Sequence, residues 1–131
     1  MNKIKSFHHF IQEHGLAPEE VIFVFDDVLD LSIAEICGVR IQINRPAGVL
    51  FNQWVALHNL ADYVTASAGG NFAVREACEL LMGLNNSFES ALQERMAFGR
   101  PYQQYLAERL AIETKVFSAA DGEVKPVSGN Q

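Results

Sequence analysis

The chain has 131 residues, 49% of them apolar, and a formal net charge of −6. A chain of this length forms one domain of ordinary size, and its apolar content excludes disorder over most of the sequence. The acidic balance argues against nonspecific nucleic-acid binding, and no apolar run reaches the roughly 18 residues that a membrane-spanning helix needs.

The first half of the chain alternates between helical and strand patterns. Apolar spacing predicts a helix over residues 3–14 that ends at Gly15. The apolar run 21–25 (VIFVF) is rich in β-branched and aromatic residues, which predicts a strand buried on both faces. The other elements of this half are predicted as a helix over 29–37, a strand over 39–43 and a short helix over 54–60.

The second half begins with a third short strand over 62–66, a turn at Gly69-Gly70 and a helix over 73–81. A long final helix is predicted over 87–117, with a bend at the Gly99-Arg100-Pro101 segment because proline removes a backbone donor. We therefore divide the chain into an α/β part (1–84), a C-terminal helical extension (85–117) and a loose polar tail (118–131).

Strands that alternate with helices predict a parallel sheet with helices on its faces, which is the α/β class. Three strands are few for such a sheet, and the final helix carries more apolar surface than a small sheet covers. This surface packs either on its own domain or on a partner subunit, and the sequence favours neither. Cys37 and Cys78 lie in apolar surroundings, which together with the absence of a leader pattern predicts a cytoplasmic protein.

Three acidic residues follow the first predicted strand: Asp26, Asp27 and Asp30. In open parallel sheets, ligands bind beyond the carboxyl ends of the strands, and carboxylate oxygens suit Mg²⁺. The alternative is that Asp27 or Asp30 caps the following helix. The acids alone leave both interpretations open.

Three segments in order resemble the second half of a haloacid-dehalogenase (HAD) superfamily phosphatase: residues 2–30, Leu60–Thr65 (LADYVT) and Gly69–Glu76 (GGNFAVRE). The last two resemble the group of 3-deoxy-D-manno-octulosonate 8-phosphate (KDO 8-phosphate) phosphatases. The resemblance implies a three-layer, Rossmann-like partial sheet with flanking helices, a phosphorylated sugar acid as substrate, Mg²⁺ as cofactor and a homo-oligomer.

The resemblance also implies roles for individual residues. Lys3 matches the lysine that offsets charge on the phosphoryl group, and Asp27 matches the acid that helps to hold this lysine. Asp26 matches the magnesium ligand of the family, and Asp30, the last acid of the same motif, is the second expected metal residue. Arg75 and Glu76 match the end of the GGxGAxRE-like motif, which implies contact with substrate.

The family mechanism also needs a DxDGx(T/V) strand, whose first aspartate attacks phosphorus, and a Ser or Thr that binds the phosphoryl group. We find neither in these 131 residues; Asp121-Gly122 copies part of the motif, but Ala119 stands at the nucleophile position. Phe25 and Asn71-Phe72 also depart from the family pattern. We therefore expect either half of a magnesium-dependent phosphatase, inactive alone, or a non-catalytic binding or oligomerisation protein derived from that fold.

Overall fold

The computed structural model describes residues 3–120 and 123–127. The helices are α1 (Lys3–His14), α2 (Leu31–Ala34), α3 (Val49–Leu57), α4 (Ala73–Leu84), α5 (Phe88–Ala97) and α6 (Arg100–Leu110), with 3₁₀ turns η1 (Pro18–Glu20) and η2 (Val28–Asp30). The strands are β1 (Ile22–Phe25), β2 (Val39–Asn44), β3 (Tyr63–Ala68), β4 (Phe117–Ala120) and β5 (Glu123–Pro126). None of the described helices is both long and apolar enough to cross a bilayer.

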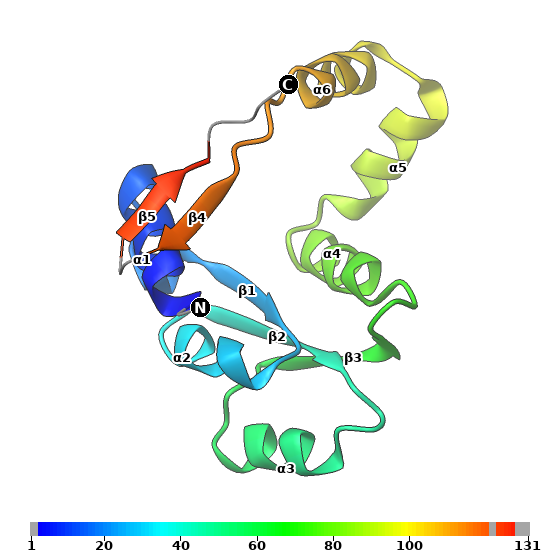
Figure 1. Cartoon of the computed structure of the whole chain (residues 1–131). Coiled ribbons are helices and arrows are strands. Elements are labelled where there is room, and N and C mark those ends of the chain that lie inside the picture. Colours follow the sequence, from blue (N-terminus) through cyan, green and yellow to red (C-terminus); the bar gives the residue numbers. More distant parts are fainter. Residues whose placement is uncertain (1–2, 121–122, 128–131) are drawn as a thin grey trace.

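The centre of the fold is a parallel three-stranded sheet in the order β1-β2-β3 (Figure 1). Helices α1, α2 and α3 cover one face, where Phe25 packs with Leu31 and Val55. On the same face Phe7 and Ile33 form a second apolar cluster that joins α1 to α2. Helix α4 packs on the opposite face, over β2 and β3. The predicted α/β class with helices on both faces is confirmed.

Strand β1 is less buried than its sequence predicts. Phe25 is buried at 2% exposure, but Ile22 and Val24, which point to the α4 side, are 48% and 36% exposed. The expectation of a strand buried on both faces is wrong for this side, because α4 covers the neighbouring strands and leaves β1 open. In the described sheet, β1 is also an edge strand that pairs with β2 alone.

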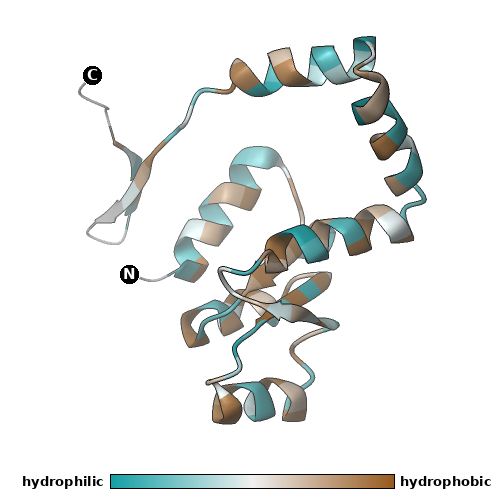
Figure 2. Cartoon of the chain, turned by 90° about the vertical axis from the view of Figure 1, so that its right-hand side faces the viewer, coloured by the Kyte–Doolittle hydropathy of each residue, from teal (hydrophilic) through white to brown (hydrophobic). Residues whose placement is uncertain are grey.

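The predicted long final helix is instead two helices, α5 and α6. Phe98 adopts a left-handed conformation (φ 47°) between them, and Pro101 lies in the first turn of α6. Neither helix contains a buried residue. We call α5 and α6 the arm, because they extend away from the sheet and its covering helices (Figures 1 and 2).

The C-terminal region differs from the loose tail that we predicted from residue 118. Strands β4 and β5 form an antiparallel pair, and the His9 ring of α1 lies edge-on to Phe117 with ring centroids 5.6 Å apart. The last helix, α6, ends at Leu110 and not at residue 117. The chain then runs back to β4 beside α1. Residues 121–122 and 128–131 of the predicted tail lie outside the described residues.

Candidate functional site

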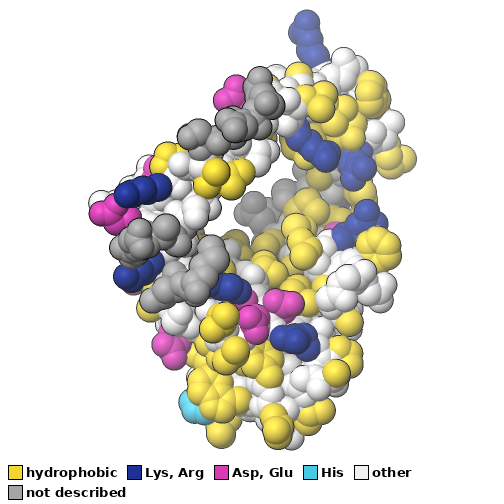
Figure 3. All heavy atoms as spheres, in the orientation of Figure 1, with side chains coloured by type: hydrophobic (Ala, Val, Ile, Leu, Met, Phe, Trp, Pro, Cys, Tyr) yellow, Lys and Arg dark blue, Asp and Glu magenta, His cyan; other side chains and the backbone are white. Residues whose placement is uncertain are grey.

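The candidate site lies where the parallel strands end. Asp26 and Asp27 directly follow β1, Arg45 directly follows β2, and the Gly69-Gly70 turn follows β3. In the space-filling view, acidic and basic side chains lie next to one another on this face of the molecule (Figure 3). Ligands of open α/β sheets bind at this edge, and Asp26 and Asp27 are the predicted site residues that directly follow a strand here.

Lys3 and Asp30 form the tightest contact of the site. Helix α1 places the Lys3 ammonium 2.6 Å from Asp30 Oδ1. This hydrogen bond, with the charge of the carboxylate, raises the pKa of Lys3. The Asp30 side chain is 10% exposed and that of Lys3 is 39% exposed. Lys3 is thus held as a cation beside the acidic cluster, and a family-like role in offsetting phosphoryl charge is compatible with its position.

Asp27 caps the turn that follows β1. Its Oδ1 accepts a hydrogen bond from the Val28 amide at 2.8 Å, and its own amide donates to Asp30 Oδ2 at 3.3 Å. Together the two side chains form a capping box on the 3₁₀ turn η2, which confirms the capping interpretation for Asp27, whereas the Asp30 side chain makes no cap hydrogen bond to α2. Asp27 Oδ2 also lies 3.9 Å from the Lys3 ammonium, and the lysine-holding role that the resemblance implies for Asp27 stays a prediction.

Asp26 differs from the other two acids, because its carboxylate is exposed and has no ion-pair partner among the described residues. It lines a hollow of about 560 Å³ together with Ile43, Gly69, Gly70 and Ala73. This hollow joins the end of β1 to the beginning of α4. Asp26 is therefore the acid of the cluster that is most accessible to a ligand.

Arg45 is a site residue that the sequence interpretation missed. Its Nη1 donates to the Asp26 carbonyl oxygen at 2.8 Å and lies 3.9 Å from Asp27 Oδ1. It brings a second cation, besides Lys3, to the edge of the sheet. Its position directly after an alternating strand was the available signal, but Pro46 made the segment look like an irregular loop.

Phe72 lines the other side of the hollow, and Arg75 lies beside its ring. Phe72 precedes α4 in a left-handed conformation (φ 62°), which is unusual for a residue with a side chain. Its ring is 71% exposed, and the Arg75 guanidinium lies 5.4 Å from the ring centroid. Arg75 thus reaches the beginning of α4, where free amides favour anions. Its role in substrate binding stays a prediction.

Glu76 is engaged within the protein. Its carboxylate accepts hydrogen bonds from the amides of Ser67 (2.8 Å) and Ala66 (2.7 Å) and from the Tyr63 hydroxyl (2.7 Å). The Ser67 amide first, then the Tyr63 hydroxyl and the Ala66 amide, lower the pKa of Glu76 to about 2. Both oxygens are occupied, so the geometry favours a role in fixing the end of β3 to α4 over contact with substrate.

Metal binding by the described residues would depend on single carboxylates and not on a cluster of protein ligands. The described residues contain no group of three or more His, Cys, Asp or Glu side chains placed to hold a metal ion. Asp30, expected as a ligand, is instead bonded to the Lys3 ammonium, which competes with a metal for the same oxygen. Asp26 alone offers a free carboxylate, and Mg²⁺ commonly takes one or two protein carboxylates, with waters and phosphate oxygens as its other ligands.

Asp62, in the LADYVT segment, has a structural role that the motif did not reveal. Its carboxylate accepts two hydrogen bonds from the Arg40 guanidinium, at 3.0 and 2.7 Å, and a third from the Arg40 amide. These bonds lower the pKa of Asp62 and raise that of Arg40. The pair joins the beginnings of β2 and β3, at the opposite end of the strands from the candidate site.

Sequence comparison identifies curated relatives of this chain, although no protein-family model matches it. The KDO 8-phosphate phosphatases KdsC of Escherichia coli K12 and Salmonella typhi are 33% identical over 90 residues. The same enzyme of Yersinia pestis is 27% identical over 90 residues. These matches cover 69% of the chain and 44% of each relative, so the chain spans less than half the length of the enzymes it matches.

Two solved structures share the fold at 26% sequence identity. The KDO 8-phosphate phosphatase of Yersinia pestis gives a TM-score of 0.56 over 67% of this chain and 44% of that chain. A hypothetical protein of Xanthomonas campestris gives 0.57 over 71% and 47%. Over the matched region, this chain is therefore homologous to the KDO 8-phosphate phosphatases of the HAD superfamily, as its motifs predicted.

Proposed function

We propose that this chain supplies half of a phosphoryl-transfer site of the sugar-phosphate phosphatase type and is inactive by itself. The observation that carries the proposal is the arrangement at the end of β1. There a free carboxylate (Asp26) and a cation held by acids (Lys3) lie at the edge of a sheet related to KDO 8-phosphate phosphatases. These groups suit metal and phosphate, but none of them is a nucleophile activated by a neighbouring base.

The open edge of β1 supports completion by another segment. In the described residues, β1 has backbone groups on one side without a strand partner, and the adjacent Ile22 and Val24 side chains are exposed. An open apolar edge pairs readily with a further strand. A strand added there would end beside Asp26, which is where an attacking carboxylate could reach a shared phosphoryl group. We place the missing aspartate motif on such a strand, supplied by another polypeptide or another part of a longer one.

We extend the proposal to a cofactor and a substrate class, supported by the name of the relatives and by the family resemblance. Mg²⁺ would have Asp26 as its ligand from this chain, with the remaining protein ligands from the completing strand. When bound, the ion would polarise the phosphoryl oxygens. Lys3, Arg45 and Arg75 would contribute positive charge toward an anionic substrate such as a phosphorylated sugar acid.

The direct test of inactivity is hydrolysis of KDO 8-phosphate by the isolated chain in the presence of Mg²⁺. We expect no enzyme-like turnover, and the same background rate for Asp26→Ala. Turnover by the chain alone that disappears in Asp26→Ala would overturn the proposal. The matched control is Glu79→Ala, which changes an exposed acid of α4 with no ion-pair partner among the described residues; Asp62→Ala would break the pair with Arg40.

The arm favours a second candidate, a non-catalytic protein that associates with copies of itself. Its exposed apolar side chains belong to α5, to α6 and to the segments that follow each of them: Leu92, Met96, Phe98, Leu110 and Ile112. Figure 2 shows apolar and polar residues mixed along both helices. Sedimentation at micromolar concentration should show a homo-oligomer, and Met96→Glu with Leu110→Glu should dissociate it. A monomer throughout would contradict this candidate.

A further inference from the structure

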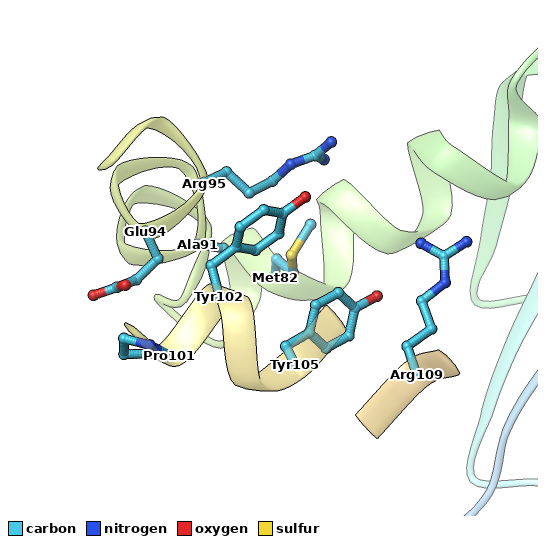
Figure 4. Close-up of a pocket in the computed structure, with 8 residues that line it drawn as sticks. All are labelled: Met82, Ala91, Glu94, Arg95, Pro101, Tyr102, Tyr105 and Arg109. Atoms are coloured by element: carbon cyan, nitrogen blue, oxygen red, sulfur yellow. The ribbon is translucent and has the colours of Figure 1, made fainter. Parts of the chain in front are cut away.

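The arm contains a cavity that the proposed phosphatase site does not use. It has a volume of about 440 Å³, within the range of small-molecule pockets. Its lining comes from three helices: Met82 of α4, Ala91, Glu94 and Arg95 of α5, and Pro101, Tyr102, Tyr105 and Arg109 of α6. Figure 4 shows these side chains around the space between the helices.

Two aromatic rings form one wall. The rings of Tyr102 and Tyr105 lie 6.1 Å apart between centroids at an interplanar angle of 26°. Met82 and Ala91 supply apolar surface beside them. Neither tyrosine hydroxyl makes a hydrogen bond to another described residue, and Figure 4 shows both hydroxyls directed toward the side where the Arg95 and Arg109 guanidinium groups lie. Such a wall offers a stacking surface to a planar ring, with donors at its edge.

Two guanidinium groups give the cavity its charge. Arg95 lies over the Tyr102 ring at 6.0 Å, and in Figure 4 Arg95 and Arg109 lie on the same side as the tyrosine hydroxyls. Among the described residues, no carboxylate lies within 4.0 Å of either guanidinium. The Glu94 carboxylate extends to the opposite side in the same view. The side of the cavity with the two guanidinium groups is therefore cationic, although the chain carries a net charge of −6.

We propose that this cavity binds a small molecule that combines a planar aromatic ring with an anionic group, as a nucleoside monophosphate does. The ring stacks on the tyrosine wall, and the anion takes hydrogen bonds from Arg95 and Arg109. Arginine suits this chemistry, because its planar fork donates two parallel hydrogen bonds to phosphate or carboxylate. Ring and anion act together, so neither chemical part alone binds as well as the whole.

The test is calorimetric titration of the full chain with AMP, adenosine and inorganic phosphate at physiological ionic strength. We expect AMP to bind at least tenfold more tightly than either fragment of its structure. Tyr105→Ala and Arg109→Ala should each weaken AMP binding at least fivefold. Tyr105 is 53% exposed, so its truncation does not open the core, and Tyr105→Phe should retain most of the affinity. Arg100→Ala, on the same helix outside the cavity, should change affinity less than twofold.

Three results would overturn the inference. AMP could bind no more tightly than adenosine and phosphate, which would show that ring and anion are not recognised together. Arg100→Ala could weaken binding as much as Arg109→Ala, which would indicate general electrostatic attraction. Asp26→Asn could alter AMP binding, which would place the ligand at the end of β1 instead. These measurements of AMP affinity do not depend on phosphatase activity. Their expected results therefore stay the same if the proposed phosphatase function fails.

Discussion

The Lys3–Asp30 ion pair offers the most informative single perturbation of the site. Replacing Asp30 by Asn removes the charge but keeps an oxygen that can accept the Asp27 amide. A hydrogen bond to a charged group contributes about 1.5–3 kcal/mol when it is well shielded from water. The Lys3 side chain is 39% exposed, so solvent screening reduces the expected loss to about 1–2 kcal/mol.

Urea unfolding measures this loss. With a slope of about 1.5 kcal/mol/M, the midpoint of Asp30→Asn should fall by about 1 M. Lys3→Met combined with Asp30→Asn should cost less than the sum of the two single changes, with a coupling energy of about 1 kcal/mol. Asp27→Asn is the matched control, because Asp27 lies 3.9 Å from the ammonium and should lose less than about 0.5 kcal/mol. Equal losses for both aspartates, or no coupling, would refute the assigned pairing.

Further predictions concern the core and the β3–α4 connection, and urea unfolding measures each of them. Phe25→Ala should lower the free energy of unfolding by about 3–4 kcal/mol, whereas Phe10→Ala, at a 51% exposed ring, should have little effect; similar losses would contradict the core assignment. Phe72→Gly should raise the free energy of unfolding by about 0.5–1 kcal/mol, because glycine adopts φ 62° without strain; a lower urea midpoint would contradict this. The pKa of Glu76 falls from 4.5 to about 2 on folding, so its contribution is complete above about pH 4.5 and is lost as the pH falls toward 2. Glu76→Gln should therefore lose less stability than the parent chain over this interval, and equal acid sensitivity would count against the assigned bonds.

Much of the sheet region was predictable from local patterns. The strand over 39–43 and the helices over 3–14 and 73–81 have regular apolar spacing, and all three are confirmed with small changes in their ends. The acidic residues that directly follow the β1 sequence also predicted correctly that Asp26 lies at the carboxyl edge of the sheet, because the carboxyl ends of parallel strands share one edge.

The errors arose where structure depends on what covers a segment. Ile22 and Val24 have the composition of a buried strand, but their exposure depends on how far α4 extends across the sheet. The division of the arm at Phe98 depends on a single left-handed residue that helical periodicity does not reveal. The sequence also does not predict which polar groups pair. It does not show that Lys3 lies closer to Asp30 than to Asp27. Nor does it show that the Glu76 carboxylate accepts hydrogen bonds from backbone amides.

A chimeric protein tests most directly the proposal that this chain supplies half of a phosphoryl-transfer site. The part of the Escherichia coli relative that carries the aspartate motif would be fused ahead of Lys3, and phosphate release from KDO 8-phosphate would be measured with Mg²⁺. We predict hydrolysis that is absent from the unfused chain and is abolished by Asp26→Asn. A chimera that folds cooperatively yet hydrolyses no faster than its Asp26→Asn variant would contradict the assignment of the β1 edge to phosphoryl transfer.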